Sequence, residues 1–354
     1  MSRHFFPGGN TPAGFFSCFD SIPFGGERTI YLKGASGSGK STFMRRAAAA
    51  FEERGLAAEY FHCSNDPGSL DGVRVPWFFS IVDGTAPHVQ DPAIPVAHDE
   101  LFNMAEFIDP RAVEKHRDEL RGLAQEKKRL YGRGCGYLAA AWAVYQNNER
   151  IYGQFLDRDG LHAAVLEALP LFDGQRGPGG GRNRNLFAAA ITPEGFVNTL
   201  DSLTHQKTIY ILQGEIGMGA DVFLAQVRGA ANLRGFGSES LCCPLDPGRP
   251  EHLILPELGL GFFTKSRLWA AEFPAGALVI DFNDFLGAGV VECQDEINYN
   301  NAMFDELAGR AVRAFAAQRE LHDRTEEIYI AGMDFDGLNQ TCENKIARLL
   351  DCAL

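Results

Sequence analysis

Eight residues near the N-terminus have the types and the spacing of a phosphate-binding loop. The run Gly34-Ala35-Ser36-Gly37-Ser38-Gly39-Lys40-Ser41 fits G-x-x-x-x-G-K-[ST] at every fixed position, and Thr42 follows it. In such a loop, backbone N–H groups surround phosphate oxygens, the lysine neutralises the β- and γ-phosphates, and the hydroxyl ligates Mg²⁺. We therefore predict that Gly34 to Thr42 bind a nucleoside triphosphate, with Lys40 catalytic and Ser41 a magnesium ligand.

The residues on either side of this loop have the patterns of a strand and a helix. Thr29 to Leu32 are β-branched, aromatic or apolar, which predicts a strand. Thr42 to Arg54 predict a helix that ends at Gly55. Because a phosphate-binding loop connects a strand to a helix, this context favours it over a flexible Gly/Ser turn.

Asp83 is the carboxylate best placed to hold the metal ion from a neighbouring strand. It ends the apolar run Phe78 to Val82, where a Walker-B-type aspartate would stand. We predict that Asp83 is a second magnesium ligand and a catalytic residue, with a plain Asp-Gly turn as the alternative. No glutamate follows Asp83, so the adjacent base of many ATPases is not visible and hydrolysis is expected to be slow or partner-dependent.

The chain contains an internal duplication. RHFFPGGNTPAGFFSCFDSI from Arg3 and RNLFAAAITPEGFVNTLDSL from Arg184 share eight identities in twenty positions, at an offset of 181. ERIYGQFLDRDGLH from Glu149 and EEIYIAGMDFDGLN from Glu326 share seven in fourteen. Between these matches, the loop glycines recur at an offset of 180. Similar offsets at three places indicate a tandem repeat.

The second copy of the loop has lost its phosphate chemistry. Gly214 to Asp221 keep the glycines, but Ala220 replaces the lysine and Asp221 replaces the hydroxyl. A carboxylate there would repel a polyphosphate, so we predict one nucleotide site, with an uncharged ligand at the second loop as the alternative. Asp83 corresponds to Phe263. Four further sites in the first half have apolar or altered counterparts and are candidates to approach nucleotide, substrate or water: Gly8-Gly9, Asn10, Ser64-Asn65 and His88.

Asp71 stands apart, because its counterpart Glu251 keeps the carboxylate in the copy without the chemistry. Catalytic and structural roles are equally favoured for it.

Fold class follows from the alternation of strand and helix patterns within each half. We predict an α/β protein of two duplicated P-loop NTPase-like domains, with parallel sheets that are each followed by a helical region. Residues 1–172 form the domain with the intact loop and 186–354 the degenerate copy, joined by the Gly-rich linker 173–185. The two halves are expected to pack on each other.

Composition limits the classes of partner. A net charge of −13 over 354 residues argues against a dedicated nucleic-acid or anionic-membrane binder. The longest apolar stretch, Gly136 to Tyr145, is too short to span a bilayer, and the N-terminus lacks the layout of a secretory signal. We therefore expect a cytoplasmic protein whose partners are small molecules or proteins.

Four segments together resemble a known family. FFPGGNTPAGFF, KGASGSGKSTFMRR, FHCSNDPGSLDG and IVDGTAPH are similar to an incompletely characterised bacterial family of ATP-binding P-loop proteins with two tandem domains, and the resemblance covers essentially the whole chain. It implies ATP binding and ATPase activity without naming a substrate. Ala220 and Asp221 depart from a working loop. GTP is disfavoured because Asn344-Lys345-Ile346-Ala347, the nearest run to N-K-x-D, lacks the aspartate.

The function expected from the sequence is a Mg-ATP-dependent ATPase with one competent site, in the first half. One alternative is a small-molecule or nucleotide kinase, in which the helical region covers an acceptor. A second is an ATP-gated interaction protein with little turnover.

Overall fold

The computed structural model describes residues 1–269 and 271–351, and these form two compact units. Unit 1 contains residues 1–8, 17–134 and 313–351. Unit 2 contains residues 9–16 and 135–312. Each unit therefore takes residues from both halves of the duplicated sequence.

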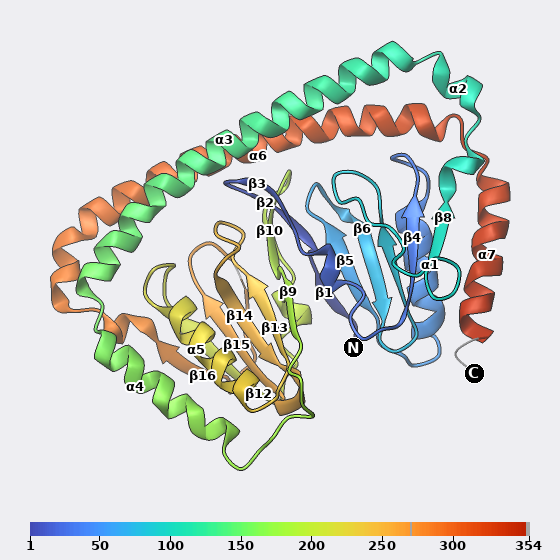
Figure 1. The fold of residues 1–354 in the computed structure, drawn as a ribbon. Coiled ribbons are helices and arrows are strands. Elements are labelled where there is room, and N and C mark those ends of the chain that lie inside the picture. Colours follow the sequence, from blue (N-terminus) through green and yellow to red (C-terminus); the bar gives the residue numbers. More distant parts are fainter. Residues whose placement is uncertain (270, 352–354) are drawn as a thin grey trace. The chain divides into compact units, whose positions relative to one another are not determined.

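A six-stranded mixed sheet forms the centre of unit 1 (Figure 1). Its strands, in spatial order, are β1 (Arg3–Phe5), β5 (Glu59–Cys63), β6 (Asp66–Val75), β7 (Phe79–Asp83), β4 (Arg28–Lys33) and β8 (Glu100–Asn103). β4 lies parallel to β7 on one side and to β8 on the other. β6 runs antiparallel to both β5 and β7.

The prediction of an entirely parallel sheet is therefore wrong at β6. The physical reason is the length of the connection after β5. Only two residues separate Cys63 from Asp66, whereas a parallel return needs a crossover of a dozen or more residues. The chain can only turn back as a hairpin, and the Asp66-Pro67-Gly68 sequence lies at that reversal.

Two helices from distant parts of the sequence pack together in unit 1. α1 (Lys40–Glu52) buries Phe43, Met44, Ala47, Ala48 and Phe51 in the core beside the sheet. α7 (Phe335–Asp351) packs against α1 and buries residues four apart, which are Leu338, Cys342 and Ile346. Figure 1 shows α7 next to α1 and β8. α7 thus completes the core around α1, the helix that follows the first glycine loop.

Unit 2 has a sheet with the same strand order. Its strands are β9 (Asn183–Leu186), β13 (Ser238–Cys242), β14 (Pro250–Leu255), β15 (Leu260–Lys265), β12 (Thr208–Gln213) and β16 (Leu278–Asp281). β14 is antiparallel to both neighbours, so the parallel prediction is wrong here as well. The two matching mixed sheets are compatible with two tandem domains.

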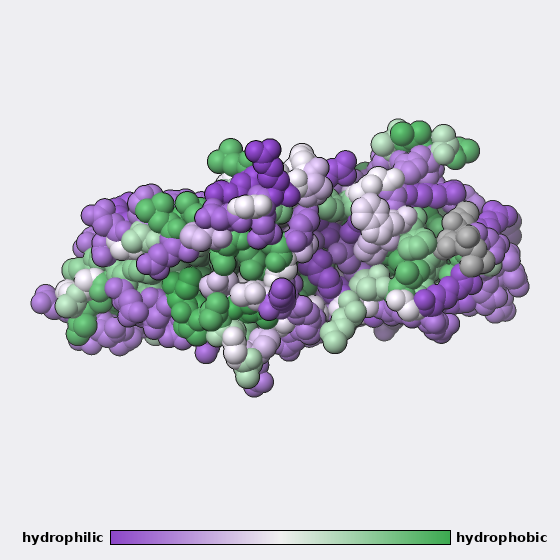
Figure 2. Space-filling model, turned by 90° about the horizontal axis from the view of Figure 1, so that it is seen from below, coloured by the Kyte–Doolittle hydropathy of each residue, from purple (hydrophilic) through white to green (hydrophobic). Residues whose placement is uncertain are grey.

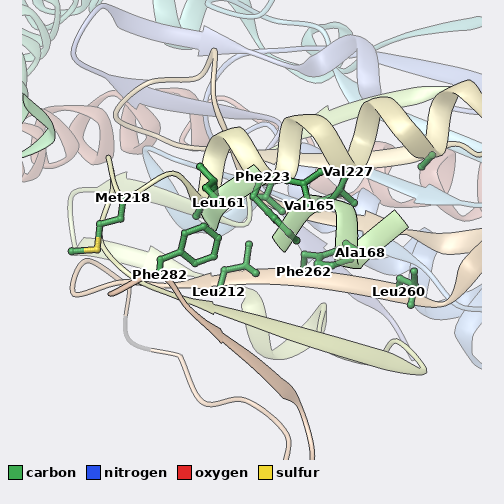
Figure 3. Packing of buried hydrophobic residues seen from close by; sticks show 14 of the residues in the cluster. Leu161, Val165, Ala168, Leu212, Met218, Phe223, Val227, Leu260, Phe262 and Phe282 are labelled. Carbon is green, nitrogen blue, oxygen red and sulfur yellow. The ribbon is translucent and has the colours of Figure 1, made fainter. Parts of the chain in front are cut away.

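The core of unit 2 lies between its sheet and two helices. α5 (Ala220–Leu233) contributes Phe223 and Val227, and α4 (Arg158–Ala168) contributes Leu161 and Val165. In Figure 3 these side chains point toward one another above the sheet residues Leu212 and Phe262. α4 belongs to the first sequence half, so the helices of the two repeats are exchanged between the units.

Two long helices carry out this exchange. α3 (Arg117–Phe155) belongs to unit 1 up to residue 134 and to unit 2 from residue 135. α6 (Gln294–Ile330) belongs to unit 2 up to residue 312 and to unit 1 from residue 313. The linker predicted at 173–185 therefore separates sequence repeats, while the compact units are divided within the helices.

The remaining elements are short. They are α2 (Pro110–Glu114), the strands β2 (Gly8–Thr11), β3 (Gly14–Ser17), β10 (Ala189–Thr192) and β11 (Gly195–Asn198), and the 3₁₀ helices η1 (Phe19–Ser21), η2 (Met104–Phe107), η3 (Leu169–Phe172), η4 (Leu200–Ser202), η5 (Pro256–Leu258), η6 (Phe282–Phe285) and η7 (Ala288–Cys293). β2 pairs with β3, and β10 pairs with β11.

Hydrophilic and hydrophobic residues are interspersed on the face of the molecule drawn in Figure 2. Within residues 1–269 and 271–351, no helix has the length and apolar character needed to cross a membrane.

The packing of α7 on α1 predicts that Leu338 stabilises unit 1. Leu338 is 3% exposed, so Leu338→Ala should lower the free energy of unfolding by about 2–5 kcal/mol. Phe335→Ala on the same helix is the control, because Phe335 is 38% exposed and should cost far less. Urea unfolding followed by circular dichroism measures both. Equal stabilities of the two variants would contradict this packing.

Candidate active site at the first glycine loop

The backbone of the first loop depends on two glycines in left-handed conformations. Gly37 has φ 74° and Gly39 has φ 85°. Side chains disfavour this region, so the two positions favour glycine. Gly39 is the N-cap of α1, and its carbonyl accepts a hydrogen bond from the N–H of Phe43 at 3.0 Å. The loop therefore leads directly into the N-terminus of α1, where backbone N–H groups and the helix dipole favour an anion.

Lys40 and Asp83 lie side by side at this loop, as the sequence predicts. The Lys40 Nζ donates to the carbonyls of Gly34 at 3.0 Å and Ala35 at 2.8 Å. It also lies 3.6 Å from Asp83 Oδ2, and both side chains are about nine-tenths buried. Sheet register explains the meeting, because Asp83 at the end of β7 pairs with Leu32, two residues before the loop.

Ser41 lies on the first turn of α1, next to β6. Its Oγ accepts a hydrogen bond from the Leu70 N–H at 3.0 Å, which leaves the hydroxyl proton available for another contact. Ser38 Oγ is buried, and within the described part of the chain it has no hydrogen-bond partner. Thr42 is exposed on α1. Of the predicted loop side chains, Lys40 and Ser41 are thus the ones placed next to other polar groups of the site.

The surroundings of Asp83 contain the turn that the sequence offered as an alternative. Its Oδ1 accepts hydrogen bonds from the Thr85 N–H at 2.9 Å and the Thr85 hydroxyl at 2.5 Å, which is the pattern of an Asx turn. Its Oδ2 is the oxygen next to Lys40. The turn therefore fixes one oxygen and directs the other toward the loop.

Two further titratable groups meet Asp83. One ligand atom each from Asp71, Asp83 and His88 lie within 4.8 Å of one another. Burial and the Asp83 carboxylate raise the pKa of Asp71 to about 8. Burial lowers the pKa of His88 to about 4, so its imidazole is neutral at pH 7. The Phe19 ring stacks on His88 with centroids 4.0 Å apart.

Helices from the second sequence half cover the outside of this loop. A methyl group built on Gly37 would come within 2.7 Å of Ile330 at the end of α6. One built on Gly39 would come within 3.2 Å of Leu338 in α7. Arg319, in the same helix α6, forms an ion pair of 2.6 Å with Asp66 at the start of β6. Sequence reasoning missed these residues because repeat spacing does not reveal which unit a helix joins.

The second glycine loop, in unit 2, keeps the backbone but not the side chains. Gly217 and Gly219 have φ 98° and 100°, and the Phe223 N–H again donates to the N-cap carbonyl at 3.0 Å. Glu215 accepts hydrogen bonds from the Tyr145 hydroxyl at 3.1 Å and the Arg267 N–H at 2.9 Å. A small cavity of about 30 Å³ beside this loop is lined by Glu215, Ile216, Gly217, Ala220, Asp221, Cys243, Arg249, Pro250, Glu251 and Thr264.

The charges around this cavity do not suit a polyphosphate. Arg249 already pairs with Glu149 and, at 2.8 Å, with Asp246. Glu251 is buried, and its Oε1 accepts from the Trp269 N–H at 2.7 Å. Burial raises the pKa of Glu251 to about 8. The cavity therefore combines acidic groups with an arginine whose charge is already matched.

Two other candidates from the sequence have different surroundings. Asn10 belongs to unit 2, where its Nδ2 donates to the Ile191 carbonyl at 2.9 Å, in a buried bond with its own repeat counterpart. Ser64 is buried just after β5. His88 was among the same candidates and does reach the site, and Asp71 joins it there. The useful signal for His88 was that the comparison of the two repeats gives a different residue in the second copy.

Comparisons with protein-family models, with curated proteins and with solved structures found no match.

The close approach of α6 to the loop predicts a specific effect of Gly37→Ala. The variant must accommodate both a left-handed alanine and a methyl group against Ile330, at a combined cost of about 2–4 kcal/mol. Gly26→Ala is the matched control, because Gly26 has φ 83° but nothing within 4 Å of the added methyl. Urea unfolding should show a clearly larger loss for Gly37→Ala. A loss no larger than that of Gly26→Ala would mean that Ile330 does not press on the loop.

Proposed function

We propose that unit 1 binds Mg-ATP at the loop Gly34 to Ser41 and hydrolyses it slowly, as a P-loop ATPase of the tandem-domain kind. The observation that supports this most is the meeting of Lys40, Ser41 and Asp83 around a glycine loop that opens a helix. The loop amides and Lys40 would stabilise charge on the transferred phosphoryl group. Ser41 and Asp83 would hold Mg²⁺.

The residues present fit these two ligands. Gly37 and Gly39 permit the loop conformation, and Ser41 Oγ keeps a free lone pair after its contact with Leu70. The Lys40 ammonium is bound by two loop carbonyls, which a phosphate oxygen can replace with a stronger charged partner. Bound Mg²⁺ would supply charge neutralisation of the phosphates.

Unit 2 is proposed to bind no nucleoside triphosphate. Its loop has the same two left-handed glycines, but Ala220 offers no ammonium and Asp221 adds a negative charge. Unit 2 would serve instead as an interface or regulatory surface.

One observation favours a second candidate function, an ATP-gated interaction protein. α6 is a continuous helix whose first residues belong to unit 2 and whose last residues cover the loop of unit 1. A phosphate that shifts the loop would press on Ile330 directly. Nucleotide binding could thereby be transmitted along α6 with little turnover.

ATP binding should depend on Lys40. Lys40→Ala removes an ammonium from the proposed phosphate site, so ATP affinity should fall at least about tenfold. Isothermal titration of the full chain with ATP and Mg²⁺ measures this change. Asp221→Ser in the second loop is the control and should leave affinity within about twofold. Equal affinity of the Lys40 variant and the unaltered protein would refute the proposed site.

The products distinguish the proposed functions. Release of inorganic phosphate from ATP supports hydrolysis. Formation of ADP with a phosphorylated small molecule from a cell extract, and without free phosphate, identifies a kinase. Tight binding with neither product, together with an ATP-dependent change in compactness, identifies the gated interaction protein.

A further inference from the structure

We propose that Asp71, Asp83 and His88 form a site for one divalent transition-metal ion such as Mn²⁺. One ligand atom from each residue lies within 4.8 Å of the other two. The three side chains come from β6, from the end of β7 and from the segment after it. Ligand atoms at about 2.2 Å from one metal ion lie about 3–4.4 Å apart, so the three side chains need only a small inward movement to share an ion.

Neighbouring groups orient the three ligands. Thr85 holds Asp83 Oδ1 through two hydrogen bonds, and Phe19 stacks on the His88 ring with an angle of 13° between the planes. Cys63 forms a side-chain hydrogen bond with Asp71. Contacts of this kind fix ligand orientation in metal sites.

The charges at the site also favour a cation. Asp71 and Asp83 are each 7% exposed, and Lys40 is bound to two loop carbonyls as well as lying near Asp83. One shared ammonium cannot offset two ionised carboxylates taken out of water, so without a metal ion one of them holds a proton. A divalent ion would take the place of that proton.

The second copy of the sequence provides an internal control. The sheet register corrects the correspondence that a constant sequence offset predicts for Asp83. Asp83 pairs with Leu32, and Thr264, not Phe263, pairs with Leu212, the repeat counterpart of Leu32. The same one-residue shift places Trp269 rather than Leu268 opposite His88 in the repeat, so neither the second carboxylate nor the imidazole is kept there. The third counterpart, Glu251, accepts a hydrogen bond from Trp269 instead. The ligand set is thus lost in the same copy that lost the lysine and the hydroxyl of the loop. If the three side chains were purely structural, their loss would not be expected to accompany the loss of the lysine and the hydroxyl.

The imidazole of His88 indicates which metal ions the site prefers. Mg²⁺ prefers oxygen ligands alone, whereas an imidazole with carboxylates suits Mn²⁺, Fe²⁺, Co²⁺, Ni²⁺ or Zn²⁺. Three protein ligands leave further positions for water or a phosphate oxygen. The site shares Asp83 with the magnesium role proposed above and so deepens that proposal, but it needs no nucleotide to form.

The test is metal binding by the full chain in the absence of nucleotide. Protein freed of metal by chelation is titrated with Mn²⁺, and free Mn²⁺ is measured by electron paramagnetic resonance. We expect one Mn²⁺ per chain, bound at least about tenfold more tightly than Mg²⁺. Electron spin echo modulation should show nitrogen coupling from His88.

Two variants test the ligands, with a third as control. His88→Leu removes the imidazole, and Asp71→Asn keeps the side-chain shape. Each should weaken Mn²⁺ binding at least about tenfold, and His88→Leu should remove the nitrogen coupling. His116→Leu, at a half-exposed histidine bonded to Glu119, should change neither. Circular dichroism confirms that each variant is folded.

Three results would overturn the site: no Mn²⁺ binding by the unaltered protein, Mg²⁺ bound as tightly as Mn²⁺, or Mn²⁺ binding unchanged in both ligand variants. These outcomes differ from failure of the proposed ATPase. Mn²⁺ binding without ATP binding would leave the metal site standing alone. ATP binding lost in Lys40→Ala, with no Mn²⁺ site, would refute the metal proposal only.

Discussion

The structure depends on glycines that hold a left-handed conformation beneath an apolar side chain. In unit 1, Gly39 lies under Leu338, and in unit 2, Gly219 lies under Leu161, where an added methyl would come within 3.2 Å and 2.8 Å respectively. Each leucine comes from the opposite half of the sequence. Both the loop conformation and the exchange of helices therefore rest on the same contact, and any larger residue at the glycine would disturb both.

This constraint explains why the second loop keeps its glycines although it lacks the lysine and the hydroxyl of the first. Gly217 and Gly219 cannot change freely, because each has a left-handed backbone and an added methyl would come within 3.0 Å of Glu149 or Leu161. Ala220 and Asp221 lie on α5, where no such backbone requirement applies. The polar side chains around the two loops can therefore differ while the loop backbone stays the same. In unit 1, Lys40 lies between loop carbonyls and the buried carboxylate of Asp83. We propose that Lys40 binds phosphate and that Asp83 binds the metal ion. In unit 2, Asp246 forms an ion pair with Arg249, and Glu251 accepts a hydrogen bond from Trp269.

Sequence patterns predicted the local structure around the loop well. The strand ending near Leu32, the loop and α1 follow from short-range signals, and the proximity of Asp83 to Lys40 follows from adjacent parallel strands. The antiparallel β6 was missed, although the two-residue connection before it excludes a crossover. The helix exchange was not predictable, because α4 and α7 have similar buried faces and amphipathic spacing does not identify the partner. For Asp71, the sequence favoured a catalytic and a structural role equally. The fold places its side chain next to Asp83 and His88.

We propose that the duplicated chain has one working nucleotide site. The most direct measurement is the number of ATP molecules bound per chain at saturation, by equilibrium dialysis of the full chain with radiolabelled ATP and Mg²⁺. We expect one ATP per chain. Two per chain would show that Ala220 and Asp221 do not disable the second loop, and none would show that the first loop binds no ATP.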